Sequence, residues 1–282
     1  MPILASNSGS RMPVLGIAAD QRGRHHVREG KTMYIPTTSI PGEFAGRRAL
    51  VTGGSRGVGA AIAQRLIDGG ATVVTSARSS HDETPKNSTF ISADIRTDDG
   101  ARQLVHAAHE ALGGLDILVN NAGAARAHFG QIPDAEWEDS LAINFLSAVR
   151  VTNAALPALQ EADRATVINI SSGVAANPPA PLLHYGAAKA ALASWSKGLA
   201  AQLAPVGVRV NVVTLGMVAT PGGTELLQSV MEAMGAGVEQ AYSAIPLGRV
   251  GAPQDVAEAV AFLASDRAQW IAGADLHING GA

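Results

Sequence analysis

From Arg48 onward the sequence alternates short apolar runs with longer segments of helical periodicity, and this alternation leaves few possible folds. The runs are almost continuous in Val, Ile and Leu, as strands buried on both faces of a sheet must be. Helix-like segments lie between most of them, and strand–helix alternation of this kind argues for a parallel sheet. We therefore predict an α/β fold with a parallel sheet and helices on both faces. The expected strands are residues 49–52, 72–76, 89–92, 117–120, 166–170, 208–213 and 275–278.

Five segments have the length and spacing of helices that pack on such a sheet. One further stretch, residues 216–245, is rich in Gly and Met and is the least regular part of the body. It lies between a strand end and a helix and is long enough to form a flap over a site. The expected helices are residues 58–68, 98–112, 135–159, 183–203 and 254–263.

The first part of the chain differs in composition from the rest. Residues 1–41 contain Ser, Gly, Pro and scattered charges, without the apolar core of a secretory signal. A disordered N-terminal extension, sequence upstream of a working start at Met33, and an organelle-targeting peptide all remain open. Because no linker-like stretch follows Pro41, residues 42–282 are predicted to form a single domain.

Composition excludes several classes of function. The net charge of −3 and the lack of a basic stripe argue against nucleic acid as a partner. The chain has no cysteine, which rules out disulfides and thiolate catalysis and fits a cytoplasmic location. No apolar run approaches the roughly 18 residues of a membrane span.

A glycine-rich turn follows the first expected strand, with the sequence Thr52-Gly-Gly-Ser-Arg-Gly-Val-Gly59. Glycine permits a tight turn and close approach of backbone N–H groups to a pyrophosphate, and the following helix offers partial positive charge at its start. A purely structural turn is the alternative. The position between a buried strand and an amphipathic helix favours a dinucleotide site.

The end of the second expected strand indicates which dinucleotide is bound. An NAD-binding chain normally has a carboxylate here to hold the ribose 2′-hydroxyl. This chain has Ala77 and Arg78, and Arg56 lies within the glycine loop. Two guanidinium groups suit a 2′-phosphate, so the sequence predicts NADP(H). Taken singly, each arginine would pass for an ordinary surface residue.

Tyr185 and Lys189 are four residues apart in an Ala-rich segment expected to be helical, so their side chains project from the same face. A phenol with a pKa of about 10 is a poor proton carrier near neutral pH. A nearby cation stabilises the phenolate and lowers that pKa, which makes the phenol usable as an acid or base. Such a pair also arises by chance on many helices.

Taken together, these motifs resemble those of the short-chain dehydrogenase/reductase superfamily, in its single-domain branch. The resemblance covers roughly residues 43–282 and rests on the glycine loop, Asn120-Asn-Ala-Gly123, Asn144, Ser171-Ser172 and Tyr185-x-x-x-Lys189, in that order. The nearest likeness is to 3-oxoacyl-(acyl-carrier-protein) reductase, supported by Pro246-Leu-Gly-Arg249 and His277-Ile-Asn-Gly-Gly281. One departure is Leu215-Gly216, where the family usually has Pro-Gly. The resemblance implies a Rossmann-type, doubly wound, seven-stranded parallel sheet.

The resemblance also implies roles for individual residues. Tyr185 would donate a proton to a carbonyl oxygen, and Ser172, thirteen positions earlier as in the family, would hydrogen-bond that oxygen. Lys189 would lower the pKa of Tyr185 and hold the nicotinamide ribose, and Asn144 would hold a water. Asn120 would either line the cofactor cleft or tie strands together. The expected cofactor-binding residues are Gly53, Ser55, Arg56, Gly57, Val58, Gly59, Arg78, Asp94, Ile95, Asn121, Ala122, Gly123, Tyr185, Lys189, Val218 and Thr220.

The leading hypothesis is an NADP(H)-dependent oxidoreductase that interconverts a carbonyl and a secondary alcohol. A catalytically silent NADP-binding sensor or partner protein is the alternative, and a Tyr185→Phe variant separates the two. The expected substrate walls are residues 124–130, residues 173–184 and the flap, and they are mostly apolar, which favours a hydrophobic ketone or alcohol. His184 would touch substrate, pack or face solvent. Apolar surface on the two longest helices predicts a homodimer or homotetramer. The flap residues expected at the substrate are Leu226, Leu227, Val230, Met231, Met234 and Tyr242.

Overall fold

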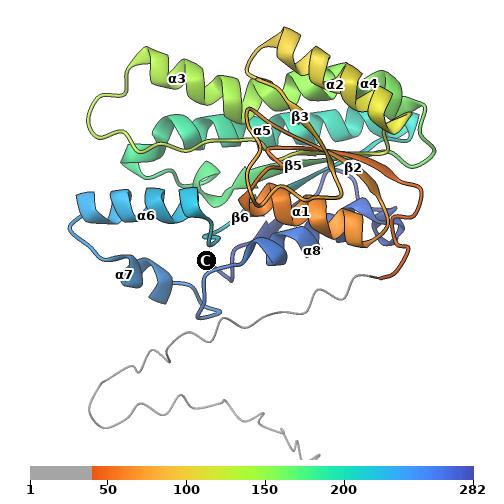
Figure 1. The fold of residues 1–282 in the computed structure, drawn as a ribbon. Helices are drawn as coiled ribbons and strands as arrows, with labels where there is room; N and C mark the ends of the chain where they lie inside the picture. Colours follow the sequence, from red (N-terminus) through yellow and green to blue (C-terminus); the bar gives the residue numbers. More distant parts are fainter. Residues whose placement is uncertain (1–39) are drawn as a thin grey trace, which may run out of the picture. The chain divides into compact units, whose positions relative to one another are not determined.

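The structure, a computed structural model, describes residues 40–282 of the chain. The predicted N-terminal extension therefore lies outside the described residues, except for its last two positions. Seven parallel strands form one sheet in the order β3-β2-β1-β4-β5-β6-β7, which confirms the predicted doubly wound, Rossmann-type fold (Figure 1). The strands are β1 (Arg48–Thr52), β2 (Thr72–Ala77), β3 (Thr89–Ser92), β4 (Ile117–Asn120), β5 (Thr166–Ser172), β6 (Arg209–Leu215) and β7 (Asp275–Ile278).

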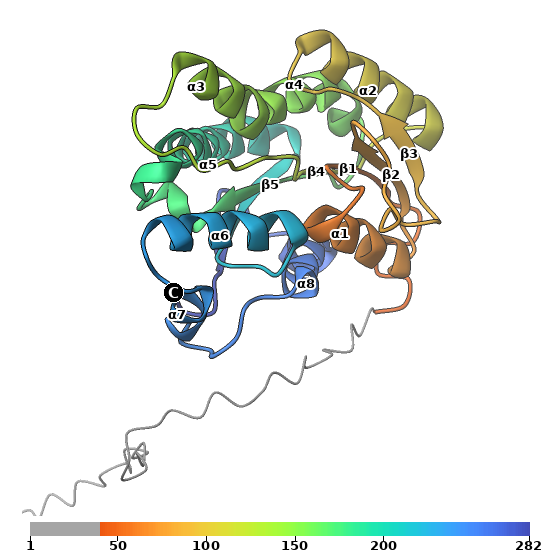
Figure 2. The ribbon, with the colours of Figure 1, turned by 60° about the vertical axis from the view of Figure 1, so that its left-hand side comes forward.

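Helices cover both faces of this sheet. Figures 1 and 2 show α1 and α8 on one face and α2, α4 and α5 on the other. Most of their bounds lie within a residue of those predicted. The helices are α1 (Gly57–Asp68), α2 (Asp98–Leu112), α3 (Asp134–Leu141), α4 (Ser147–Gln160), α5 (Leu183–Leu203), α6 (Pro221–Ala233), α7 (Val238–Ser243) and α8 (Pro253–Ala264).

Alternate residues of the central strands supply two separate hydrophobic cores. Val51 and Val119 pack in the core beneath α1 and α8, whereas Leu50 and Leu118 pack in the core beneath α2, α4 and α5. All four side chains are fully buried. This two-sided burial explains why the strands are continuous apolar runs in the sequence and do not alternate with polar residues.

The direction in which strands are added reverses between β1 and β4, which are paired in the middle of the sheet. Strands β2 and β3 continue the sheet outward from β1, whereas β5, β6 and β7 continue it outward from β4. In open parallel sheets of this kind, ligands bind beyond the carboxyl ends of the strands at such a switch point. The glycine loop after β1 and the Asn121–Gly123 segment after β4 both lie there.

Three parts of the chain differ from the prediction. The expected helix 135–159 is interrupted by a π-helical turn at Ala142–Leu146, between α3 and α4. The expected irregular flap contains two helices, α6 and α7. Its first helix begins with a recognisable signal, because Thr220 accepts a hydrogen bond from Gly223 N and Pro221 is the first helical residue. The third difference is in β5 and β6, each of which ends two residues later than expected, at Ser172 and Leu215.

The β2–β3 connection contains no helix among its residues 78–88, although the two strands are parallel. It is shorter than the roughly dozen residues of a helical crossover. None of the helices in residues 40–282 is both long and apolar enough to cross a bilayer.

Candidate active site

The glycine loop has the backbone conformation that its glycines allow. Gly53 and Gly57 have φ values of 65° and 55°, in the left-handed region that other residues rarely adopt. A Cβ on Gly59 would overlap the carbonyl oxygen of Gly53, so α1 can begin this close to the loop only with glycine there. This geometry leaves the first amides of α1 without helical partners, as phosphate binding requires.

Asn121 fixes the glycine loop to the end of β4. Its Nδ2 donates to the carbonyl oxygens of Thr52 and Gly53 at 3.0 and 3.1 Å, and its backbone N donates to Thr52 Oγ1 at 3.1 Å. Asn121 thus shapes the loop from behind. A direct cofactor contact by its side chain stays a prediction.

Asn120 ties the sheet together, which answers the alternative left open by the sequence. Its Nδ2 donates to Thr152 Oγ1 and Asn169 Oδ1, at 2.9 and 2.8 Å. Asn169 Nδ2 in turn donates to Ser196 Oγ of α5 at 2.8 Å. All four residues are buried. These hydrogen bonds join β4 and β5 to α4 and α5, and the part that Thr152, Asn169 and Ser196 play in them was not predicted.

A pocket of about 660 Å³, its open mouth included, lies beyond the ends of β1, β2 and β4. Six of the predicted cofactor residues line it: Gly53, Arg78, Asp94, Ile95, Ala122 and Gly123. Ala77, at the end of β2, and Ala124 and Arg126, from the expected substrate wall, line it too. Reading the sequence missed the other lining residues, namely Ser76, Ala93, Arg96, Asp139 and Ile143.

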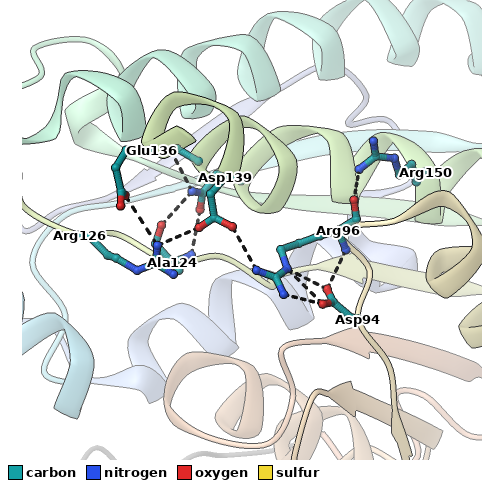
Figure 3. Close-up of polar contacts among 9 residues, drawn as sticks. Asp94, Arg96, Ala124, Arg126, Glu136, Asp139 and Arg150 are labelled. Atoms are coloured by element: carbon teal, nitrogen blue, oxygen red, sulfur yellow. Dashed lines mark hydrogen bonds and ion pairs between the residues drawn. The ribbon is translucent and has the colours of Figure 1, made fainter. Parts of the chain in front are cut away.

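A chain of ion pairs runs along one wall of this pocket (Figure 3). Arg96 pairs with Asp94 at 2.6 Å and with Asp139 of α3 at 3.1 Å, and Asp139 also pairs with Arg126 at 2.9 Å. Glu136 approaches the same Arg126 at 3.7 Å. The row connects the end of β3 to the segment after β4 that was expected to line the substrate.

Charge pairing sets the ionisation of these carboxyl groups. The hydrogen bond from Arg96 lowers the pKa of Asp94 to about 2. Burial alone would raise the pKa of Asp139, but hydrogen bonds from Arg96 and Arg126 bring it below its ordinary value. Both groups are therefore anionic near neutral pH, and Arg126 is neutralised by its partners.

The two arginines expected at a 2′-phosphate are both exposed, Arg78 lining the pocket and Arg56 lying in the glycine loop. Within residues 40–282, neither the Arg56 nor the Arg78 side chain has a hydrogen-bond or ion-pair partner. Arg78 lowers the pKa of Asp94 through its charge, which places it near that carboxylate. Free guanidinium groups beside a glycine loop fit a phosphorylated ribose.

A carboxylate is also present at the glycine loop. Glu83, in the β2–β3 connection, accepts a hydrogen bond from the backbone N of Gly57 at 2.8 Å. The sequence argument concerned the end of β2, where no carboxylate stands, and did not anticipate one from the β2–β3 connection. The contact depends on the path of the connection in space, which a count of residues from the glycines does not reveal.

Ser172, Tyr185 and Lys189 come together beyond the end of β5. The Ser172 side chain lies close enough to the Tyr185 phenol to lower the pKa of that phenol. Lys189 Nζ lies 6.0 Å from the centre of the Tyr185 ring and donates to the carbonyl oxygen of Ile170 at 2.8 Å. Ser172 is the last residue of β5, and the other two lie one turn apart on α5.

Burial and Ser172, and not Lys189, account for the shift in the pKa of Tyr185 in this structure. Burial raises the pKa of Tyr185, and the Ser172 side chain offsets only part of that rise. Burial also lowers the pKa of Lys189 to about 8, so its positive charge is weakened. The ammonium is directed at the Ile170 carbonyl oxygen, and the lowering of the phenol's pKa by Lys189 stays a prediction.

Asn144 lies in the π-helical turn and is buried. Its Nδ2 donates to the Ala124 carbonyl oxygen at 2.8 Å, and its Oδ1 accepts from Ala124 N at 3.0 Å. A Cβ added to Gly123 would lie 2.9 Å from Asn144 Oδ1 and 3.4 Å from Lys189 Nζ. The structure thus brings Asn144, Gly123 and Lys189 to one place. Single π-helical turns, such as the one that contains Asn144, often occur at functional sites.

The two predicted substrate walls meet, because His128 N donates to the Pro181 carbonyl oxygen at 2.9 Å. His184 packs and does not face solvent: its ring stacks edge-on against Trp137 with centroids 6.1 Å apart. At the base of the flap, Thr220 lies against the glycine loop, and a Cβ on Gly57 would be 3.2 Å from its methyl group. Val218 forms an isolated bridge with Gly251.

Comparison with known proteins identifies the class of this chain. Residues 53–282 match the family model described as enoyl-(acyl carrier protein) reductase. The chain is 36% identical over 245 residues to 3-oxoacyl-(acyl-carrier-protein) reductase of Salmonella typhimurium, covering 84% of this chain and 98% of that protein. It is therefore an NAD(P)-dependent oxidoreductase that acts on CH–OH or carbonyl groups.

Two solved structures agree. A short-chain dehydrogenase from Burkholderia cenocepacia, solved with NADP, is 34% identical with a TM-score of 0.76, over 85% of this chain and 98% of that one. L-Sorbose reductase from Gluconobacter frateurii, solved with NADPH and L-sorbose, is 26% identical with a TM-score of 0.77, over 86% and 98%. The chain belongs to the short-chain dehydrogenase/reductase family.

Proposed function

We propose that this protein is an NADP(H)-dependent oxidoreductase that interconverts a ketone and a secondary alcohol, with Tyr185 as the general acid and base. The observation that carries the proposal is the convergence of Ser172, at the end of β5, with Tyr185 and Lys189 of α5 at the carboxyl edge of the sheet. A nicotinamide supplies and accepts the hydride in such a reaction.

In the reductive direction, Tyr185 donates its proton to the carbonyl oxygen, and Ser172 donates a hydrogen bond to the same oxygen. These two contacts stabilise the negative charge that develops there. Burial raises the pKa of Tyr185, so the phenol is protonated at neutral pH and ready to act as an acid. Lys189 Nζ and Asn144 Oδ1 lie beside Gly123, and Asn144 also hydrogen-bonds Ala124.

The cofactor is NADP(H), held by Arg56 and Arg78 at its 2′-phosphate. Support comes from these two unpaired guanidinium groups and from relatives whose structures contain NADP or NADPH. Gly53, Asp94 and Ile95 line the pocket that would take the adenosine. The remaining expected contacts, from Ser55, Gly57, Val58, Gly59, Asn121, Ala122, Gly123, Tyr185, Lys189, Val218 and Thr220, belong to the same proposal.

The test is a panel of ketones and secondary alcohols, followed by absorbance of the reduced nicotinamide. We expect turnover with NADP(H) for the wild type. A Tyr185→Phe variant should lose about 10²–10⁴-fold in rate, the usual contribution of a positioned proton donor, yet bind NADP⁺ as the wild type does. Undiminished turnover by the variant would show that Tyr185 is not the acid.

We also infer the substrate class, the oligomeric state, the cellular location and the domain organisation of this enzyme. The walls near the site are mostly apolar and Arg126 is neutralised, which favours an uncharged hydrophobic substrate. Phe145 and Trp195 stack edge-on, half-buried, with centroids 6.3 Å apart, and would pack in a homodimer or homotetramer of a cytoplasmic enzyme. Residues 42–282 form the single domain. Light scattering that reports a monomer would remove the oligomer from the proposal.

A further inference from the structure

The β2–β3 connection is built onto the glycine loop. Thr84 Oγ1 donates to the Ser55 carbonyl oxygen at 3.1 Å and accepts from His81 N at 2.9 Å. At the other end of the connection, Ser88 Oγ and Thr75 Oγ1 are 3.1 Å apart. Because no helix carries this crossover away from the sheet, the connection runs along the edge where the cofactor loop lies.

The consequence of that path is the position of Glu83. Its Oε2 accepts from Gly57 N, the first amide of α1, and Gly57 follows Arg56 directly in the chain. Arg78 lies where the connection leaves β2. The β2–β3 connection therefore supplies both Arg78, a cation expected at the 2′-phosphate, and Glu83, an anion that contacts the glycine loop.

Resting on the NADP(H) preference proposed above, we propose that Glu83 is a specificity-determining residue that competes with the cofactor's 2′-phosphate for the glycine loop. The loop amides face the pyrophosphate that both cofactors have, so the discrimination comes from charge: Glu83, held at the residue after Arg56, repels a 2′-phosphate bound by Arg56 and Arg78. Glu83 must leave Gly57 N, or stay and repel the phosphate. In either case it weakens NADP(H) more than NAD(H), which lacks the 2′-phosphate, and so moderates the preference that Arg56 and Arg78 create.

The chain offers a matched pair of variants. Glu83→Gln keeps the size and one acceptor oxygen of the side chain and removes only the charge. Asp82→Asn removes the same charge one residue earlier, and within residues 40–282 Asp82 has no hydrogen-bond or ion-pair partner. Both residues are exposed, so neither change threatens folding.

The experiment measures dissociation constants of NADP⁺ and NAD⁺ by calorimetry at physiological ionic strength. Because a hydrogen bond to a charged group is strong but this one is exposed, we expect Glu83→Gln to bind NADP⁺ about 3- to 10-fold more tightly. NAD⁺ affinity should change much less, and Asp82→Asn should match the wild type because salt screens its distant charge. Unchanged or weaker NADP⁺ binding by Glu83→Gln would overturn the proposal, as would an equal gain for NAD⁺ or for Asp82→Asn.

A second measurement separates this inference from the proposed function. In protein without added cofactor, Glu83→Gln should shift the amide resonance of Gly57, and Asp82→Asn should leave it in place. An unmoved resonance in Glu83→Gln would show that the contact does not form. A wild type that binds NAD⁺ but not NADP⁺ would instead refute the proposed cofactor.

Discussion

Replacing Lys189 with Met should make the protein more stable at neutral pH while it removes a proposed catalytic residue. The Lys189 side chain is 3% exposed, and burial lowers its pKa from 10.5 to about 8. This drop corresponds to about 3 kcal/mol by which folding disfavours the ammonium. Met is unbranched and similar in length, so it can fill the same space. Losing the hydrogen bond from Lys189 Nζ to the Ile170 carbonyl oxygen costs about 1 kcal/mol of folding free energy.

The expected net gain in the free energy of unfolding at pH 7 is thus about 2 kcal/mol, or roughly 4–8 °C in Tm for a domain of this size. The sign of the pH dependence follows from proton counting. Between pH 8 and 10.5 the unfolded chain keeps a proton on Lys189 that the folded protein has released. Wild-type stability therefore rises through this window relative to the variant. The variant's advantage should shrink from pH 8, vanish near pH 10 and then reverse, because only the lost hydrogen bond remains.

The assay is urea unfolding of wild type and variant at pH 7, 8, 9 and 10, with the difference between them taken at each pH. Groups that titrate alike in both proteins cancel in that difference. Lys197→Met is the control, because Lys197 lies exposed on the same helix, α5, and should give a difference that does not depend on pH. A Lys189→Met variant that is less stable at pH 7, or whose advantage stays constant to pH 10, would refute the reasoning.

The elements of the sheet were predictable because their signals are local. A strand buried on both faces must be apolar throughout, and a loop with positive φ at Gly53 and Gly57 needs glycine, so both are visible in the sequence. The start of α6 was equally visible as Thr220-Pro221. We expected an irregular flap there because the Gly and Met content of the segment outweighed its capping signal.

The rest depends on contacts between distant parts of the chain. The π-helical turn at Asn144 interrupts a segment whose apolar spacing is ordinarily helical, and the reason lies in its hydrogen bonds to Ala124. The contact of Glu83 with Gly57 arises from a crossover without a helix. Spacing placed Lys189 one turn from Tyr185, but the pKa values of both depend on burial, which spacing does not report.

Two further substitutions test the architecture of the site. Gly59→Ala should cost about 3 kcal/mol or more, because its Cβ would overlap the Gly53 carbonyl and force the loop apart, whereas Gly198→Ala, in open space on α5, should stabilise by about 1 kcal/mol. Chemical denaturation compares them, and equal effects would contradict the packing argument. Asp139→Asn removes the charge that holds Arg96 and Arg126 along the pocket wall. This change should raise the KM for substrate several-fold while kcat changes little. The same variant should unfold more easily than the wild type at pH 7, where Asp139 is ionised because its pKa is lowered, and this deficit should fade as acid protonates the wild-type carboxyl. A deficit that persists at low pH would mean that the ion pairs along this wall contribute nothing to stability.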